Sequence, residues 1–178
     1  MSKALLEDLE WRGLIAQSTD RKELETALSK PISLYLGVDP TAPSMHLGNL
    51  VVFLVLRRFQ LAGHRPIALV GGATGLVGDP SGKNDERTLN EEKIVADWVS
   101  KIRRQVEKIL DFKDKSVSAK LVNNLDWTKS VSALELLRDI GKHFSVNQML
   151  AKDSVATRLS STGISYTEFS YQVLQAYD

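Results

Sequence analysis

The sequence contains no cysteine among its 178 residues, which excludes disulfide bonds, thiolate metal sites and cysteine nucleophiles. It also has little net charge, because 23 basic and 22 acidic residues leave a formal charge of +1. No global electrostatic field therefore indicates a nucleic-acid or membrane partner, although one basic face offset by acidic residues elsewhere could still bind RNA. No stretch approaches the ~20 apolar residues of a membrane-spanning helix.

The amino-terminal residues 1–11 alternate acidic and apolar side chains. They lack the basic start and the continuous apolar core of a signal peptide, so the expected location is the cytoplasm. Apolar residues make up 43% of the sequence and charged residues 25%, and both fractions are close to the averages for soluble globular proteins. A chain of this length suffices for one domain with a hydrophobic core.

The spacing of apolar residues predicts an alternation of helices and strands. Strands are expected at 32–38, 66–70 and 120–122. Three helices are expected before the second strand: one along Leu5, Leu6, Leu9 and Leu14, one that begins at an Asp20 cap, and one from His46 or Leu47 to Leu61. Three more are expected later in the chain: one along Ile94, Trp98, Ile102, Val106 and Leu110, one along Leu134, Leu137 and Ile140 that ends at Gly141, and one from Tyr166 or Thr167 onward. This order indicates an α/β fold, the first half of a Rossmann-like, doubly wound parallel sheet. The last helix has no stop signal, so we interpret the sequence as part of a longer protein.

The junction between the first strand and the following helix is the first candidate site. Backbone N–H groups at a helix start lack intrahelical partners and can bind an anion. His46 and Thr41 can donate hydrogen bonds to phosphate oxygens. Gly48 leaves room for a flat base, and Asn49 offers an amide donor. The alternative, in which His46 is a cap residue and Gly48 a packing glycine, stays open. The helix is apolar nearly all round as far as Leu56, which predicts that this half is buried.

The glycine-rich segment 71–90 is the second candidate, and it predicts an ordered turn followed by a mobile loop. The spacing from Gly78 to Gly82-Lys83 is one residue too short for a Walker phosphate loop, and no glycine of the segment starts the dinucleotide-binding spacing. We therefore expect its glycines to let a strand end approach a bound ligand closely. Asp79 would lie at the carboxyl edge of the sheet, where open α/β folds bind ligands. Lys83 and Arg87 could reach a polyphosphate, or they could be routine charges of a solvated loop.

Tyr171, Gln175 and Asp178 form a third set, because spacings of four and three residues place them on one helix face. This polar stripe could line a pocket, although the spacing alone favours exposure to solvent. The three histidines are far apart and none pairs with a carboxylate at metal-ligand spacing, and there is no Gly-x-Ser-x-Gly nucleophile elbow. His64 follows the helix-closing Gly63 and is expected to serve that helix terminus.

Several runs closely resemble bacterial-type tyrosyl-tRNA synthetases, which are class I aminoacyl-tRNA synthetases. The likeness extends from Leu9 to the end of the chain. Its strongest runs are YLGVDPTA at 35–42, AGHRPIALVGGATG at 62–75, GDPS at 78–81, GKHFSVN at 141–147 and FSYQVLQAYD at 169–178. Several long runs in the same order are far more specific than any single motif.

The resemblance implies a tyrosine site. Tyr35 and Asp178 match residues that hydrogen-bond the phenol hydroxyl. Asp79, Tyr171 and Gln175 match residues that hold the α-ammonium group. A buried carboxylate and hydroxyl aimed at the phenol would reject phenylalanine, because it leaves both unpaired; this enzyme family is itself a standard example of that discrimination.

The resemblance also implies an ATP site around His46-Leu47-Gly48-Asn49, which stands in the place of the HIGH motif. Thr41 and His46 match positions that contact the ATP phosphates, and Asp39 lies at the turn whose backbone meets the α-phosphate. The expected ATP-binding set is Gly37, Asp39, Thr41, His46, Gly48 and Asn49. Asn49 replaces the second histidine of the strictest motif, so it can donate a hydrogen bond but carries no charge.

The implied reaction is attack of the L-tyrosine carboxylate on the α-phosphate of ATP, which gives tyrosyl-adenylate and pyrophosphate, followed by transfer of the tyrosyl group to tRNA(Tyr). No protein nucleophile or general base is required, since catalysis is positioning and stabilisation of phosphate charge. The expected catalytic set is Thr41, His46, Asn49, Lys83 and Arg87, in which Lys83 and Arg87 match mobile-loop cations that steady departing pyrophosphate. Mg²⁺ would accompany the ATP, although no carboxylate cluster indicates a protein-bound metal.

The expected domain organisation also follows from the resemblance. Residues 1–30 form an amino-terminal helical segment, and residues 31–178 form an incomplete catalytic Rossmann-like domain. Within it, residues 90–165 match a helical insert that forms a homodimer interface and helps receive the tRNA acceptor end. The second half of the sheet, the KMSKS loop and the anticodon-binding and carboxyl-terminal domains of the family are missing, so we expect little adenylate formation from this chain alone.

Two alternatives remain. A tryptophan-activating relative or another HIGH-type nucleotidyl transferase is disfavoured by Tyr35 and Asp178, because an indole or an aliphatic acid does not need that pair. A truncated, non-catalytic module that dimerises or binds tyrosine without activating it is the other alternative.

Overall fold

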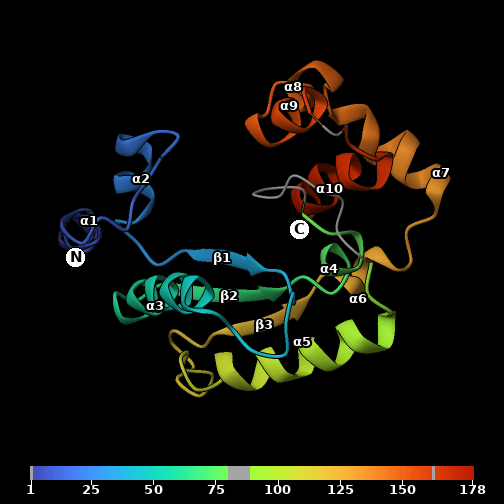
Figure 1. The fold of residues 1–178 in the computed structure, drawn as a ribbon. Coiled ribbons are helices and arrows are strands. Elements are labelled where there is room, and N and C mark those ends of the chain that lie inside the picture. The colour runs from blue at the N-terminus through green and yellow to red at the C-terminus, as the bar shows by residue number, and fades with distance from the viewer. Residues whose placement is uncertain (1, 80–88, 162) are drawn as a thin grey trace. The chain divides into compact units, whose positions relative to one another are not determined.

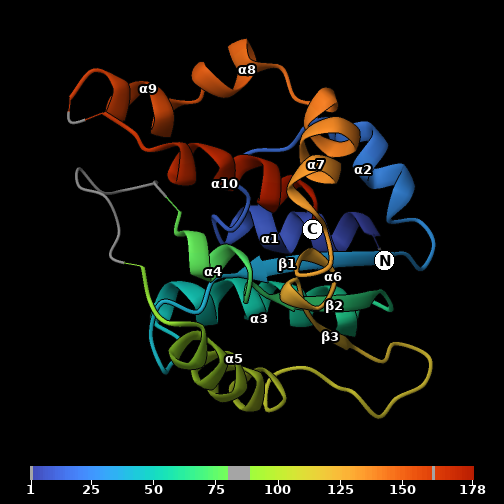
Figure 2. The ribbon, with the colours of Figure 1, turned by 90° about the vertical axis from the view of Figure 1, so that its right-hand side faces the viewer.

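The structure, a computed structural model, describes residues 2–79, 89–161 and 163–178. The chain forms two compact units. The first unit comprises Met1–Val38, Ala42–Val70 and Ser100–Val122, and the second comprises Asp39–Thr41, Gly71–Val99 and Asn123–Asp178. Figure 1 and Figure 2 show the elements of both units from two directions, and each unit is described by itself.

The first unit is built on a parallel sheet with the strand order β1-β2-β3 (Figure 1). Its strands are β1 (Ser33–Val38), β2 (Arg65–Val70) and β3 (Lys120–Asn123), and its helices are α1 (Ser2–Trp11), α2 (Arg21–Ala27) and α3 (Leu47–Leu61). β1 and β2 run parallel and in full register, and α3 connects them and packs on both. This strand–helix–strand arrangement confirms the predicted α/β fold class.

Local chemistry explains how the first two helices begin and end. Asp20 caps α2, as predicted, by accepting a hydrogen bond from the Glu23 N–H at 2.8 Å. Gly13, with a φ of 67°, lies just beyond the end of α1, and the Leu14 N–H returns to the Leu9 carbonyl at 2.9 Å. α1 therefore ends before Leu14, which the apolar spacing had included in the helix.

The prediction that α3 is buried nearly all round as far as Leu56 is wrong. Phe53 and Leu56 are buried, whereas Val51 and Leu54 are 44% and 46% exposed. α3 contacts β1, β2 and α1, and these neighbours cover one side of the helix. The apolar pattern shows which side chains can be buried, but it does not show how many neighbours surround the helix.

His64 serves the end of α3 through its backbone, because its N–H donates to the Phe59 carbonyl at 3.0 Å. The His64 side chain does not serve the helix terminus as a positive charge, which is the role that the prediction gave it. The ring is 2% exposed, and its Nδ1 accepts a hydrogen bond from the Ile32 N–H at 3.4 Å. Burial lowers the pKa of His64 below its usual value of 6.5, so the side chain is a neutral core residue.

The second unit consists mainly of short helices. They are α4 (Thr74–Val77), α5 (Glu92–Val106, which continues into the first unit), α6 (Leu125–Thr128), α7 (Ala133–Glu135), the π-helix η1 (Leu136–Ile140), the 3-10 helix η2 (Gly141–His143), α8 (Val146–Leu150), α9 (Asp153–Leu159) and α10 (Tyr166–Ala176). Within this unit, α10 packs against α4, and α8 packs against α9.

Two details of these helices differ from the predictions. α5 buries Val95 and Ile102, whereas Ile94 is 40% exposed, so the apolar face begins one residue later than predicted. The predicted helix along residues 134–140 changes from an α-helix to a π-helix at Leu136. Such a change depends on the packing of the neighbouring chain and leaves no mark in apolar spacing.

The two units cut across the predicted segments. Residues 1–30 belong to the first unit together with the sheet, while residues 90–165 are shared between both units. The predicted domain boundaries therefore remain a prediction. Within the described ranges, no helix has the length and apolar character needed to span a membrane.

Candidate functional site

The start of α3, in the first unit, carries the motif His46-Leu47-Gly48-Asn49. His46 is the N-cap: its Nδ1 accepts a hydrogen bond from the Asn49 backbone N–H at 3.2 Å, and its own N–H donates to Asn49 Oδ1 at 3.4 Å. This reciprocal pair is a capping box. Because Nδ1 is an acceptor, the ring proton lies on Nε2, which can donate to a ligand. The capping role is thus confirmed, and the phosphate role remains a prediction that is compatible with it.

Gly48 and Gln105 hold this motif in place. A Cβ on residue 48 would lie 3.0 Å from Cε1 and 3.1 Å from Nδ1 of His46, so glycine lets the imidazole ring lie over the first turn. Gln105 of α5 accepts a hydrogen bond from the Met45 N–H at 3.1 Å and donates to the Pro43 carbonyl at 3.5 Å. It fixes the loop before His46. Sequence analysis missed Gln105, since no pattern distinguishes it from other polar residues of an amphipathic helix.

In the second unit, the side chain of Asp39 accepts hydrogen bonds from two hydroxyl groups. Thr74 Oγ1 donates to Oδ1 at 2.5 Å, and Tyr171 OH donates to Oδ2 at 2.8 Å. A Cβ on residue 71 would overlap both Asp39 Oδ1 and Thr74 Oγ1, so Gly71 is what allows this close approach. The space beside Gly71 is thus taken by side chains of the chain itself, and the approach of a ligand to the glycines of this segment stays a prediction.

Asn124 joins Asp178 to the same network. Its Nδ2 donates to Thr74 Oγ1 at 3.1 Å and to Asp178 Oδ1 at 2.9 Å, and its Oδ1 accepts a hydrogen bond from the Ala73 N–H at 2.7 Å. This amide is 1% exposed. Sequence analysis missed Thr74 and Asn124. Asn124 had a usable signal, because a polar residue directly after a strand lies at the carboxyl edge of the sheet.

The pKa values in this network reflect burial and negative charge. Burial raises the pKa of Asp39 above 3.8; hydrogen bonds from Thr74 and Tyr171 oppose this rise, and the charges of Asp79 and Asp178 add to it. Burial also raises the pKa of Asp178, against the hydrogen bond from Asn124. The pKa of Tyr171 is raised above 10.0 by burial and then by the charge of Asp39.

We refer to Asp39, Asp79 and Asp178, together with the Tyr171 hydroxyl, as the acidic cluster. The charges of Asp79 and Asp178 act on both Asp39 and Tyr171, and both charges are negative. A cation placed among these groups would lower that repulsion. An ammonium group carries three N–H donors and no acceptor, and carboxylate and phenol oxygens are acceptors for it. In the described part of the chain, no group of three or more His, Cys, Asp or Glu side chains is arranged to hold a metal ion.

The predicted site residues fall into three groups. The second unit brings together Asp39, Asp79, Tyr171 and Asp178, and it also contains the exposed residues Thr41 and Gln175. The first unit contains Tyr35, Gly37, His46, Gly48 and Asn49. Lys83 and Arg87 lie outside the described residues. The prediction for Asp39 concerned its backbone, which was expected to meet the α-phosphate. In the structure its side chain also takes part in the hydrogen-bond network.

Comparison with known proteins identifies one family. The family model described as tRNA synthetases class I (W and Y) matches residues 27–178. The tyrosine–tRNA ligase of Acidothermus cellulolyticus is 61% identical over 178 residues, which cover 98% of this chain and 42% of the relative. The tyrosine–tRNA ligase of Mycobacterium tuberculosis is 58% identical and covers 100% of this chain and 42% of the relative. The chain therefore spans less than half the length of these curated relatives.

Solved structures agree with this result. A C-terminally truncated mitochondrial tyrosyl-tRNA synthetase of Aspergillus nidulans superposes with a TM-score of 0.86 at 33% identity, over 98% of this chain and 52% of that chain. The tyrosyl-tRNA synthetase of Archaeoglobus fulgidus, solved with L-tyrosine, gives a TM-score of 0.60 at 21% identity over 88% of this chain and 46% of that chain. At that identity the second match supports the fold alone.

Proposed function

Because the chain belongs to the class I tRNA synthetases of the tryptophan and tyrosine group, we propose that it supplies the tyrosine site and part of the ATP site of a tyrosine–tRNA ligase. The relatives that are 61% and 58% identical to it carry that name. The chain spans 42% of each relative, so the proposed reaction is that of the whole ligase, to which these residues contribute.

The acidic cluster is the observation that carries the proposal. Tyr171 OH donates to Asp39 at 2.8 Å, and the charges of Asp79 and Asp178 raise the pKa values of both groups. The α-ammonium group of L-tyrosine would supply a positive charge that the Asp39 and Asp79 carboxylates favour. In our proposal, Asp79, Tyr171 and Gln175 hold this ammonium group, and Asp39 orients the Tyr171 hydroxyl.

The phenol end of the substrate is assigned to Tyr35 and Asp178. Asn124 holds the Asp178 carboxylate at 2.9 Å, which supports a carboxylate of fixed orientation. Tyr35 is 56% exposed in the first unit, so the expectation that its hydroxyl is buried is wrong. Phenylalanine would offer neither residue a hydrogen-bonding hydroxyl, and an indole would not match them. Selectivity for tyrosine over phenylalanine and tryptophan follows from this pair.

The ATP site is assigned to the motif at the start of α3 and to the residues around it. The His46 Nε2–H and the Asn49 side-chain amide would donate to phosphate oxygens at a helix start that already favours anions. The remaining proposed contacts come from Gly37, Asp39, Thr41, Gly48, Lys83 and Arg87. Mg²⁺ would enter with the ATP and neutralise part of its phosphate charge.

The proposed chemistry needs no nucleophile from the protein. The tyrosine carboxylate attacks the α-phosphate, pyrophosphate leaves, and a hydroxyl of tRNA(Tyr) in the cytoplasm then takes the tyrosyl group from the adenylate, with release of AMP. Positioning and charge stabilisation carry the reaction. Since the chain spans 42% of its relatives, we expect this chain by itself to form little adenylate, which leaves tyrosine binding as its measurable activity.

A homodimer is part of the proposal. Apolar side chains of the second unit are exposed along residues 134–150: Leu134 at 80%, Leu137 at 59%, Val146 at 58% and Leu150 at 38%. We propose that these side chains contribute to one interface, since apolar surface is typical of protein–protein contacts. A second copy of the chain would cover them.

Binding of amino acids to the purified chain tests the proposed function. Calorimetry should detect L-tyrosine and should detect neither L-phenylalanine nor L-tryptophan at the same concentrations. The Asp178→Asn variant should bind tyrosine more weakly, because the amide no longer accepts as a charge. Equal binding of tyrosine and phenylalanine would contradict the proposal. Pyrophosphate release approaching the enzyme concentration would contradict the expected lack of adenylate formation, and its absence together with tyrosine binding favours the non-catalytic alternative for this chain.

A further inference from the structure

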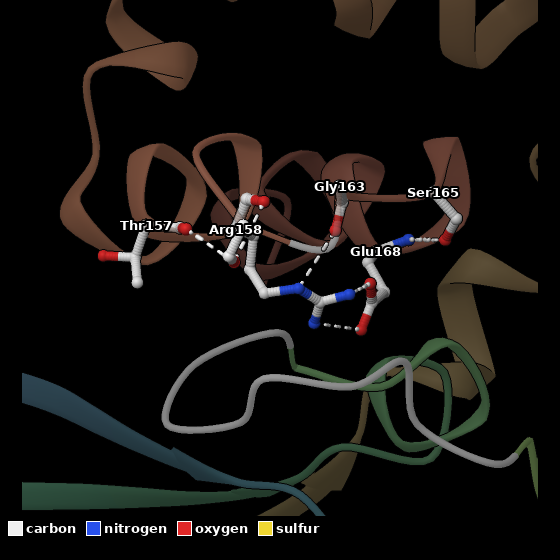
Figure 3. A network of polar contacts seen from close by, with 6 residues as sticks. Thr157, Arg158, Gly163, Ser165 and Glu168 are labelled. Carbon is white, nitrogen blue, oxygen red and sulfur yellow. Dashed lines mark hydrogen bonds and ion pairs between the residues drawn. The ribbon is translucent and has the colours of Figure 1, made fainter.

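Arg158 and Glu168 form a buried ion pair in the second unit (Figure 3). Their side chains are 4% and 1% exposed. Arg158 Nη1 donates to Glu168 Oε1 at 3.3 Å and Nη2 donates to Oε2 at 2.9 Å, while Nε donates to the Gly163 carbonyl at 3.0 Å. One planar guanidinium thus connects α9, the segment that follows it and α10.

Glu168 occupies the first turn of α10. Ser165 caps this helix, and its hydroxyl accepts a hydrogen bond from the Glu168 N–H at 3.3 Å. In a capping box the glutamate side chain would return to the backbone of the cap residue. Here the carboxylate points to Arg158 instead (Figure 3), so the orientation of the first turn depends on Arg158 as well as on the cap.

Tyr171 lies one turn beyond Glu168, on the same side of α10. Both residues are buried. Since a helical turn is rigid, the position of Glu168 determines where the Tyr171 hydroxyl meets Asp39, at 2.8 Å. The carboxyl end of the helix is held separately, through Asp178 and Asn124.

Stability alone does not require an ion pair at this position. Replacing a buried ion pair by apolar side chains of similar volume is often neutral or stabilising, so apolar packing could join α9 to α10 equally well. Apolar packing lacks the direction of a bidentate guanidinium–carboxylate contact, which fixes the rotation and register of the helix.

We propose that the Arg158–Glu168 pair is a positioning element that sets the orientation of α10 and thereby aims the Tyr171 hydroxyl at Asp39. The expected effect of this pair on tyrosine binding rests on the proposed function. The expected effect on the Tyr171 hydroxyl is independent of that function, because the contact between Tyr171 and Asp39 is present without any substrate.

The test compares three variants with the parent chain. Arg158→Met/Glu168→Leu replaces the pair by apolar side chains, and Arg158→Lys keeps the charge but loses the bidentate contact. Lys129→Ala/Glu92→Ala removes an exposed pair of the same unit (2.9 Å; 69% and 61% exposed) and is the matched control. The measurements are the tyrosine ¹³Cζ NMR signal of residue 171 without ligand, assigned with Tyr171→Phe, and the affinity for L-tyrosine.

In folded Arg158→Met/Glu168→Leu, we expect the Tyr171 signal to move toward that of the exposed Tyr166 and tyrosine affinity to fall roughly tenfold. Arg158→Lys should shift the Tyr171 signal in the same direction. If the double variant does not fold, the Tyr171 signal of Arg158→Lys tests the proposal by itself. The control should match the parent. An unchanged Tyr171 signal in the folded pair variants would overturn the proposal. A shifted signal in a chain whose parent does not bind tyrosine would support the positioning role and contradict the proposed function.

Discussion

At the scale of single residues, Asp39 is a carboxylate kept in surroundings that do not favour its charge. Two hydroxyl groups donate to it, yet burial and the neighbouring Asp79 and Asp178 raise its pKa. Proteins accept such local costs mainly at functional sites. A bound ammonium group would turn the repulsion into attraction, so the cost and the proposed binding role have the same origin.

The pH dependence of stability tests this description of Asp39. Because its pKa is above 3.8 in the folded chain, the unfolded chain loses this proton first as the pH rises. The contribution of protonated Asp39 to the free energy of unfolding is therefore fully present below pH 3.8, and it is lost as the pH rises through the folded-state pKa of Asp39. The Asp39→Asn variant has no such proton to lose, so its stability lacks this dependence on pH. In thermal unfolding, the stability of the variant relative to that of the parent should therefore increase with pH. A constant difference between the two across this range would show that Asp39 does not titrate with a raised pKa.

At the scale of elements, the predictable features are those set by local chemistry. The cap at Asp20, the strand at residues 33–38 and the helix from Leu47 to Leu61 all follow from side chains within a few positions of one another. Burial was harder to predict, as the exposed Val51 of α3 illustrates. It depends on how many other elements surround a helix, which the helix sequence does not contain.

The residues of the candidate site also divide into those that the sequence predicted and those that it did not. Tyr171 and Asp178 were predicted because the family motif marks them. Thr74 and Asn124, which connect Asp178 to Asp39, were missed because hydrogen bonds between residues 35 to 54 positions apart leave no periodic pattern. Family resemblance finds residues that touch a substrate more readily than residues that hold those residues in place.

The start of α3 offers a test at this scale. Gly48→Ala would favour the helix by up to about 1 kcal/mol but would displace the His46 ring, whose cap contributes about 1 kcal/mol. We expect the melting temperature to change little and the affinity for an ATP analogue to fall several-fold. Leu47→Ala, in the same turn and at an exposed position (80%), is the control and should bind ATP like the parent. Equal affinities of Gly48→Ala and Leu47→Ala would contradict the role given to His46.

At the scale of the whole molecule, the chain carries one strand–helix–strand unit and a helical unit with the acidic cluster. It matches its relatives over 42% of their length. The proposed tyrosine site lies in the part that the chain contains. Tyrosine binding can therefore be tested directly, whereas tRNA charging requires the whole ligase.

The proposed homodimer is also a property of the whole molecule. Leu134→Asp/Leu137→Asp places charges on the exposed apolar surface of the second unit and should convert a dimer into a monomer in analytical ultracentrifugation. Leu61→Asp, at a 71% exposed position of the first unit, should leave the dimer unchanged. A dimer that survives the double substitution would place the interface elsewhere.

The most direct test of the central claim compares two ligands that differ only in the ammonium group, L-tyrosine and 3-(4-hydroxyphenyl)propionate, by calorimetry. A charge-assisted hydrogen bond contributes roughly 1.5–3 kcal/mol, and 1.4 kcal/mol corresponds to a factor of ten. The parent chain should therefore bind L-tyrosine at least about tenfold more tightly, and Tyr171→Phe should lose most of that advantage. Equal affinity of the parent chain for both ligands would contradict the assignment of Asp79, Tyr171 and Gln175 to the ammonium group.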